Sequence, residues 1–267
     1  MTNTEMTTSV AYSDLVKGEY YFFGQPLFEH LIWEKDLVEI IALSTGKNTL
    51  TEEEKKFLNA LAMITAPPDP RIWPLKAARI LASYGCFFAG LATANLCLGE
   101  ARIGFHVLGE AAQLLKEVNC VAQHTSDNQV EEKIYKLIKT KKHLAGFGVP
   151  LRETDERIDA LRLAAEQLGK RNRLTYWRTF ELLWHILGKT KGLSPNIALP
   201  TSAALLDLGF QVKDIPVFCT TTAQYVFAAH AHEGAQKASP LLQRFPDTLI
   251  QYEGKELQQS PRSRNAD

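Results

Sequence analysis

The chain has 267 residues, and its 30 basic residues balance 30 acidic ones, so that the formal net charge is zero. This length allows one large domain or two unequal domains around an extensive apolar core. The charge balance gives no reason to expect nucleic acid or an anionic membrane as a partner, which leaves small-molecule chemistry or protein contact.

The chain begins with a polar stretch. Residues 1–15 lack the basic and apolar regions of a secretory signal, so we predict a flexible tail there. A short extended piece is indicated at 19–24, EYYFFG. Residues 25–47 repeat apolar side chains at spacings of three and four, which predicts a helical region that Gly46 closes.

The next helix is expected after Thr51, whose hydroxyl can cap a first turn rich in glutamate. The prolines of residues 66–74, APPDPRIWP, must end it, because proline lacks an amide donor and clashes with the preceding turn. Residues 80–99 are the most apolar stretch and are about long enough to cross a bilayer. Polar residues and glycines interrupt them, so we predict a buried central helix there, open to close packing by another helix, rather than a membrane span.

Helices also dominate the rest of the chain. Periodicity and glycine turns predict them at 101–118, 128–142, 155–172, 174–190, 192–210 and 214–236. Residues 248–254 could be extended, and the polar tail 256–267 is predicted to be disordered. Because the four cysteines show no paired spacing, we expect reduced, buried thiols and a cytoplasmic protein. The predicted fold class is all-α.

A series of segments carries a resemblance to a known family. They are GQPLFEHLIWEKDLVEIIALSTGK, DPRIWPLKAARILAS, ARIGFHVLGEAAQLLKEV, HLAGFGVPLRETDERIDAL, SPNIALPTSAALLDLGF, AAHAHEGAQ and FPDTLIQYEG. In this order and spacing, from about Gly18 to Gly254, they resemble the citrate synthase superfamily, and its short citryl-CoA lyase-like members in particular. The resemblance implies a citrate synthase-like fold with a large and a small helical domain that close on a cleft, in a homodimer.

The resemblance also implies domain bounds and ligands. The large domain would comprise 16–116 and 223–255, and the small domain 117–222. The cleft would hold a coenzyme A thioester as co-substrate, with no permanently bound cofactor. No metal site is expected, because His230 and His232 straddle an alanine in a helix and point to different faces.

The family's reaction needs three groups. A carboxylate takes the α-proton of the thioester, one histidine stabilises the enol oxygen, and a second acts on the oxygen of the keto partner. In IGFHVLGEA, His106 matches the first histidine, although a histidine beside a turn is the alternative interpretation. Val149 of GFGV stands where the second histidine would be, and Ala198 of PNIA stands where the carboxylate would be. Two of the three catalytic groups are therefore absent.

The substrate side has also changed. Arg157 of DER matches the arginine of the family's D-P-R segment, and Arg244 lies near a family arginine. A histidine expected near DPRIWP and an arginine expected before the A-H pair are missing, which makes oxaloacetate an improbable substrate, since a buried carboxylate needs cationic partners. Arg71 and Lys76 are the new candidates for binding an acid group. The other positions predicted to contact substrate are Asn196, Val149 and Ala198.

The resemblance places coenzyme A against the glycine turn. The predicted contacts are Lys142, Gly146, Phe147, Gly148, Pro150, Leu151 and Arg152, with Lys141, Lys142 and Arg152 available for phosphates. A tight interhelical turn with a solvated basic face is an equal alternative. No replacement base can be selected among Asp69, Glu110, Asp155 and Asp207, and Thr201 or Ser202 could only contribute a hydroxyl.

These observations favour a divergent enzyme that acts on an acyl thioester, with acyl-CoA as the expected class. It would form or cleave a carbon–carbon bond by enol chemistry without oxaloacetate, as an acyltransferase or lyase. One alternative is a catalytically silent paralogue that binds CoA esters or a partner synthase. Another is a thioester hydrolase or isomerase in the same cleft.

Overall fold

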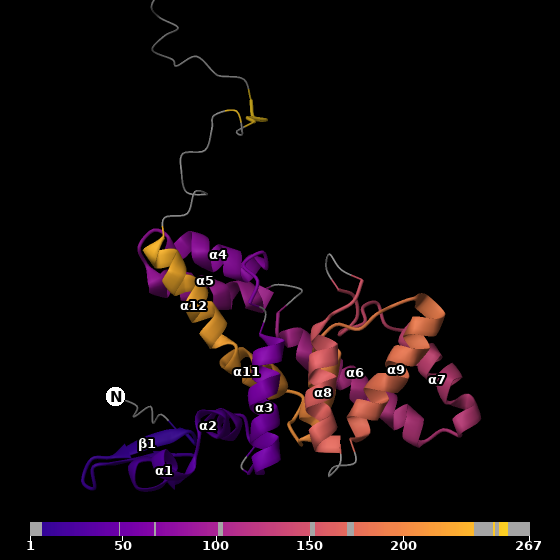
Figure 1. Cartoon of the computed structure of the whole chain (residues 1–267), viewed down its shortest axis with the longest axis horizontal. Helices are drawn as coiled ribbons and strands as arrows, with labels where there is room; N and C mark the ends of the chain where they lie inside the picture. Colours follow the sequence, from indigo (N-terminus) through magenta and orange to yellow (C-terminus); the bar gives the residue numbers. More distant parts are fainter. Residues whose placement is uncertain are drawn as a thin grey trace, which may run out of the picture.

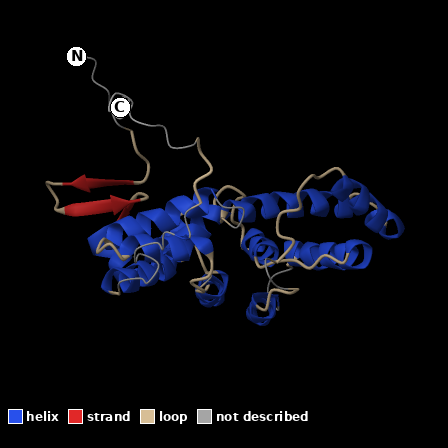
Figure 2. Cartoon of the chain, turned by 90° about the horizontal axis from the view of Figure 1, so that it is seen from above, coloured by secondary structure: helices blue, strands red, loops and turns tan. Residues whose placement is uncertain are grey.

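Helices make up most of the chain (Figure 1). The computed structural model describes residues 7–47, 49–66, 68–100, 104–149, 153–169, 174–237, 248 and 251–255. Figure 2 shows a strand hairpin at one side of an otherwise helical molecule. The predicted all-α class is confirmed.

Three short strands form an antiparallel sheet near the N-terminus, in the order β1–β2–β3. They are β1 (Ala11–Asp14), β2 (Glu19–Phe22) and β3 (Gln25–Pro26). Strand β2 confirms the extended piece predicted at 19–24, whereas β1 lies in the segment predicted to be a tail. Tyr12 pairs with Tyr21, and their rings stack with centroids 4.8 Å apart. This cross-strand contact orders a stretch whose composition is polar.

The helical region predicted at 25–47 is divided into three pieces. They are a π-helical turn η1 (Leu27–Leu31), α1 (Ile32–Glu34) and α2 (Leu37–Ser44). Asp36 has an extended backbone and accepts a bond from the amide of Glu39 (3.0 Å), while the Glu39 carboxylate accepts one from the amide of Asp36 (3.1 Å). This capping box starts a new helix where periodicity alone predicts continuity.

The cap predicted for the next helix is confirmed. Helix α3 spans Glu52–Thr65, and the Thr51 hydroxyl accepts a bond from the amide of Glu54 (3.3 Å). The Glu54 carboxylate accepts one from the amide of Thr51 (2.8 Å), and α3 ends at Thr65, before the first of the prolines.

The single buried helix predicted at 80–99 is wrong. The stretch belongs to two helices, α4 (Trp73–Ala82) and α5 (Phe87–Glu100), joined by a turn in which Gly85 has φ +85°. Glycine adopts a left-handed backbone readily, so Gly85 can form a turn within a segment whose apolar residues alone predict one helix. Helix α5 is also not central, because Phe88 and Leu96 are exposed.

The later helices lie mostly where they are predicted. They are α6 (His106–Gln123), α7 (Asp127–Lys139), α8 (Arg157–Gly169), α9 (Thr175–Lys191), α10 (Ala198–Asp207), α11 (Ile215–Thr222) and α12 (Gln224–Gln236). The segment predicted as one helix at 214–236 is divided at Ala223. Residues 251–255 form no strand, and part of 248–254 lies outside the described residues.

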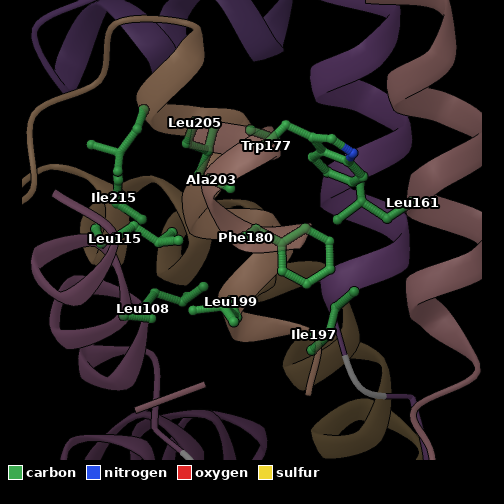
Figure 3. Close-up of a cluster of buried hydrophobic side chains, with 14 of the residues drawn as sticks. Leu108, Leu115, Leu161, Trp177, Phe180, Ile197, Leu199, Ala203, Leu205 and Ile215 are labelled. Atoms are coloured by element: carbon green, nitrogen blue, oxygen red, sulfur yellow. The ribbon is translucent and has the colours of Figure 1, made fainter. Parts of the chain in front are cut away.

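Helix α10 lies at the centre of the larger core. Every side chain from Leu199 to Leu206 is buried, and α10 packs against α3, α6, α8 and α9. Figure 3 shows side chains of α6, α8, α9 and α11 gathered around Leu199 and Leu205. A turn at the start of α10 is therefore held from several sides.

A second, smaller core joins α4, α5 and α12. The partly buried Phe105 packs against both cores. These helices approach closely, since a Cβ on Gly234 would lie 2.8 Å from the carbonyl oxygen of Arg79. The domain division into 16–116 with 223–255 and 117–222 stays a prediction.

The cysteines are free, and their burial differs from the expectation. Cys219 is buried, and burial raises the pKa of its thiol to about 12, but Cys86 and Cys120 are exposed. Among the described helices, none has the length and apolarity needed to cross a membrane.

Candidate functional site

Two turns are joined at the start of α10. The amide of Asn196 donates to the carbonyl oxygen of Gly146 (2.8 Å), and the amide of Gly148 donates to that of Ser194 (3.1 Å). Phe147 and Pro195 form an isolated antiparallel bridge between these bonds. The turn at 144–149 and the turn at 193–197 therefore form one structural unit, which we call the paired turns.

Gly146 and Gly148 of the GFG segment share a left-handed backbone but differ in their surroundings. Both have left-handed backbone, with φ +83° at Gly146 and +84° at Gly148. A Cβ on Gly146 would lie 2.7 Å from the Cβ of Leu199, so the turn touches α10 there with no room for a side chain. Gly148 is exposed and has no atom within 4 Å of such a Cβ. The backbone at Gly148 is thus open to a ligand.

Asn196, predicted to contact substrate, is used within the chain. Its Nδ2 donates to the carbonyl oxygen of Gly148 (3.0 Å), and its Oδ1 accepts from the amide of Ala198 (3.0 Å). One side chain therefore closes the paired turns and caps the first turn of α10.

The start of α6 packs against α10, the helix that follows the paired turns. The Ser202 hydroxyl on α10 donates to the carbonyl oxygen of Leu108 in the first turn of α6 (2.7 Å). This hydroxyl, considered above for a role in catalysis, therefore joins two helices. His106 is the first residue of α6 and is exposed. Val149 and Ala198 are half-buried, and Ala198 is the first residue of α10. Three neighbouring elements thus carry His106 and the two apolar replacements.

Arg157, predicted to bind substrate, forms a bidentate pair with a buried aspartate. Its Nε lies 2.8 Å from Asp155 Oδ1 and its Nη2 lies 2.7 Å from Oδ2. Asp155 Oδ2 also accepts from the amide of Ile197 (2.9 Å), and Arg157 Nη1 donates to the carbonyl oxygen of Thr65 (3.5 Å). The pair therefore ties the starts of α8 and α10 to the end of α3.

Charge and hydrogen bonding keep Asp155 ionised. Burial opposes ionisation, but the Arg157 guanidinium and the amide of Ile197 outweigh it, so the pKa of Asp155 lies below its usual value. A carboxylate held in this way is a structural strut rather than a general base.

The other candidate carboxylates have defined partners or positions. Asp69 pairs with Arg71, with Nη2 to Oδ2 at 2.5 Å, in a surface ion pair in which the Arg71 side chain is largely exposed. Asp207 accepts from the amides of Tyr176 (2.9 Å) and Trp177 (2.8 Å) and caps α9, and burial raises its pKa. Glu110 is exposed one turn after His106, on the same side of α6.

The remaining predicted contacts are exposed or outside the described residues. Lys76 and Lys142 are exposed, while Lys141 pairs with Glu117 at 2.5 Å. Phe147 is half-buried in the paired turns. The predicted contacts outside the described residues are Pro150, Leu151, Arg152 and Arg244.

Two features were not predicted from the sequence. The hydroxyl of Thr201 is buried and has no hydrogen-bond partner among the described residues. His185 is exposed and lines a groove between α8 and α9.

Comparison with known proteins finds likeness in structure only. No family model and no curated protein sequence matches the chain. Citryl-CoA lyase from Hydrogenobacter thermophilus superposes with a TM-score of 0.79 at 20% identity, covering 97% of this chain and 98% of that one.

Two larger proteins are similar over part of their length. ATP citrate lyase from Methanothrix soehngenii, solved with citrate and coenzyme A, gives a TM-score of 0.68 at 17% identity, covering 98% of this chain and 43% of that one. Citrate synthase from Thermoplasma acidophilum, solved with carboxymethyl coenzyme A and oxaloacetate, gives 0.61 at 16%, covering 86% and 60%. The resemblance inferred from the order of turns is thereby confirmed at the level of architecture: the chain has the all-α citrate synthase-like fold.

Proposed function

We propose that the chain binds an acyl-CoA thioester at the paired turns and beside His106, and forms or cleaves a carbon–carbon bond there without oxaloacetate. The observation that carries the proposal is the contrast between the two sides of the site. The paired turns keep an open backbone at Gly148, whereas Arg157, which matches a family arginine, is held by the buried Asp155, and the other candidate cations, Arg71 and Lys76, are exposed surface side chains.

The chemistry assigned to His106 is stabilisation of an enol or enolate oxygen. Breaking the bond at the α-carbon moves its electron pair toward the thioester carbonyl, so negative charge develops on that oxygen. The imidazole and the positive end of the α6 dipole are suited to stabilise this charge. Glu110 is our candidate for the proton transfer, because it lies one helical turn from His106.

The second carbon partner is proposed to be less charged than oxaloacetate. A buried dianion needs several cationic donors, and each unpaired carboxylate is costly. Val149 and Ala198 add apolar surface where polar catalytic groups are lost. A keto or aldehyde group with an apolar substituent fits these surroundings.

A His106→Ala variant tests the role of this histidine. We expect turnover of a CoA-ester panel by the wild-type protein without oxaloacetate, and a loss of about 10²-fold in kcat in the variant. His232→Ala, an exposed histidine on α12, is the matched control. Turnover that His106→Ala leaves unchanged would remove this residue from the mechanism.

A second candidate is a catalytically silent paralogue that binds CoA esters or a partner synthase. The silent paralogue is favoured because the side chains of Arg157 and Asn196 form their hydrogen bonds within the chain and thereby serve the fold rather than a substrate. Calorimetric binding of a CoA ester with no turnover would identify this case. Release of free coenzyme A without bond cleavage at carbon would instead indicate a thioester hydrolase, and product rearrangement an isomerase.

We further propose a homodimer that uses α5. Phe88, Ala92 and Leu96 repeat every fourth residue and are all exposed, which forms an apolar stripe. We expect light scattering after size exclusion to show a dimer, and Phe88→Glu with Leu96→Glu to give monomers. Met63→Glu, at an exposed apolar position on α3, should leave the mass unchanged. A monomeric wild-type chain would contradict the proposal.

The free cysteines fit a reducing compartment, and we propose the cytoplasm.

A further inference from the structure

A shallow groove, largely open to solvent, lies between α8 and α9, on residues distinct from those of the paired turns. Its volume is about 490 Å³. The lining residues, all on these two helices, are Arg162, Glu181, Trp184, His185, Gly188 and Lys189. Figure 1 shows α8 and α9 as neighbouring helices in the part of the chain that holds the larger core.

An aromatic platform forms the base of the groove. The Trp184 ring stacks on the fully buried Phe180, with centroids 5.8 Å apart and an interplanar angle of 26°. Gly188, one turn further along α9, would place a Cβ no closer than 4.0 Å to Trp184 Cδ1. Phe180 thus supports one side of the indole, and Gly188 leaves its Cδ1 edge uncovered.

The cations of the groove are loosely engaged, unlike Arg157. The Arg162 guanidinium lies 5.1 Å from the Trp184 ring centroid, and its Nη1 is 3.4 Å from the largely exposed Asp159. Lys189 Nζ is 4.0 Å from Glu131 Oε2, and both side chains are more than half exposed. Such surface pairs contribute little, so both cations can turn to an anionic ligand at small cost.

We propose that this groove binds an adenine nucleotide. The adenine ring stacks on Trp184 in place of the Arg162 guanidinium, and the phosphates lie between Arg162 and Lys189. The Glu181 carboxylate, which would repel phosphate, accepts a hydrogen bond from the exocyclic amine of the base, and His185 borders the same ligand. The stacking surface, the two cations and the acceptor together should bind a nucleotide more tightly than the nucleoside alone or pyrophosphate alone.

The experiment is a calorimetric titration of the full chain with ADP, followed in parallel by tryptophan fluorescence. We expect saturable binding with quenching, and at least about tenfold weaker binding of adenosine, pyrophosphate and UDP. Arg162→Gln and Lys189→Gln should each weaken ADP about tenfold. Gly188→Leu should abolish binding by filling the groove. Lys136→Gln, which changes an exposed side chain on α7, should leave ADP binding unchanged.

The outcomes separate this site from the proposed CoA site. Glu181→Gln should reduce the preference for ADP over UDP, and His106→Ala should leave ADP binding unchanged. Absence of saturable ADP binding, or equal affinity for pyrophosphate alone, would overturn the proposal. So would ADP binding that Gly188→Leu leaves intact. Because coenzyme A itself contains an adenosine diphosphate unit, Gly148→Ala separates the two sites: it should leave ADP binding unchanged, and ADP binding that it weakens while Gly188→Leu leaves it intact would place the nucleotide at the paired turns.

Discussion

Replacement of Asp155 by alanine is expected to lower the free energy of unfolding by about 3 kcal/mol at pH 7, because it leaves Arg157 without its carboxylate and the amide of Ile197 without its acceptor. Asp155→Asn should lie between, since an amide oxygen can still accept one bond. Urea denaturation measures both values. The control is Asp159→Ala, a carboxylate in the first turn of α8 that is 82% exposed and should cost less than about 0.5 kcal/mol.

The pH dependence gives a second readout of the same strut. Because the pKa of Asp155 is lowered in the folded chain, its contribution is complete above the unfolded pKa of about 4 and is lost as the pH falls through the folded value. The stability difference between wild type and Asp155→Ala should therefore shrink in acid. If the difference stayed constant down to pH 2, the ionised pair would not be its source.

Gly146→Ala is expected to cost about 3 kcal/mol, the sum of left-handed strain and of a contact with Leu199 that the buried helix cannot relieve. Gly148→Ala has nearly the same φ but meets no atom, so strain alone should cost about 1 kcal/mol. The difference in midpoint of urea unfolding isolates the steric contact. Equal losses in the two variants would show that the turn does not press against α10.

The same two variants probe the site. Gly148→Ala should fold almost normally and still weaken CoA-ester binding, because the new methyl group occupies the open side of the paired turns. A Gly148→Ala protein that binds CoA esters as the wild type does would place the ligand elsewhere.

The order of turns along the sequence was enough to predict the fold. Helix starts marked by Thr51 and the break at the prolines are local features, and local chemistry decides them. The division between α4 and α5 was missed because residues 80–99 contain several glycines and polar residues, and the sequence does not show which of them adopts the left-handed turn found at Gly85.

The structure shows how the chain itself uses residues predicted for the site, and their roles toward a ligand stay predictions. The partners of Arg157 and Asn196 are Asp155, Gly148 and Ala198, and charge patterns in a sequence do not reveal which ion pair is satisfied internally. The groove between α8 and α9 had no linear signal, because Arg162 and Trp184 lie on different helices and meet only after folding.

Phe105 connects the two hydrophobic cores at the start of α6. Its ring packs against both the larger core and the smaller core of α4, α5 and α12, and the next residue is His106. The start of α6 is therefore positioned by two cores at once, and a substitution that loosens the smaller core is expected to reach the surroundings of His106 through this contact.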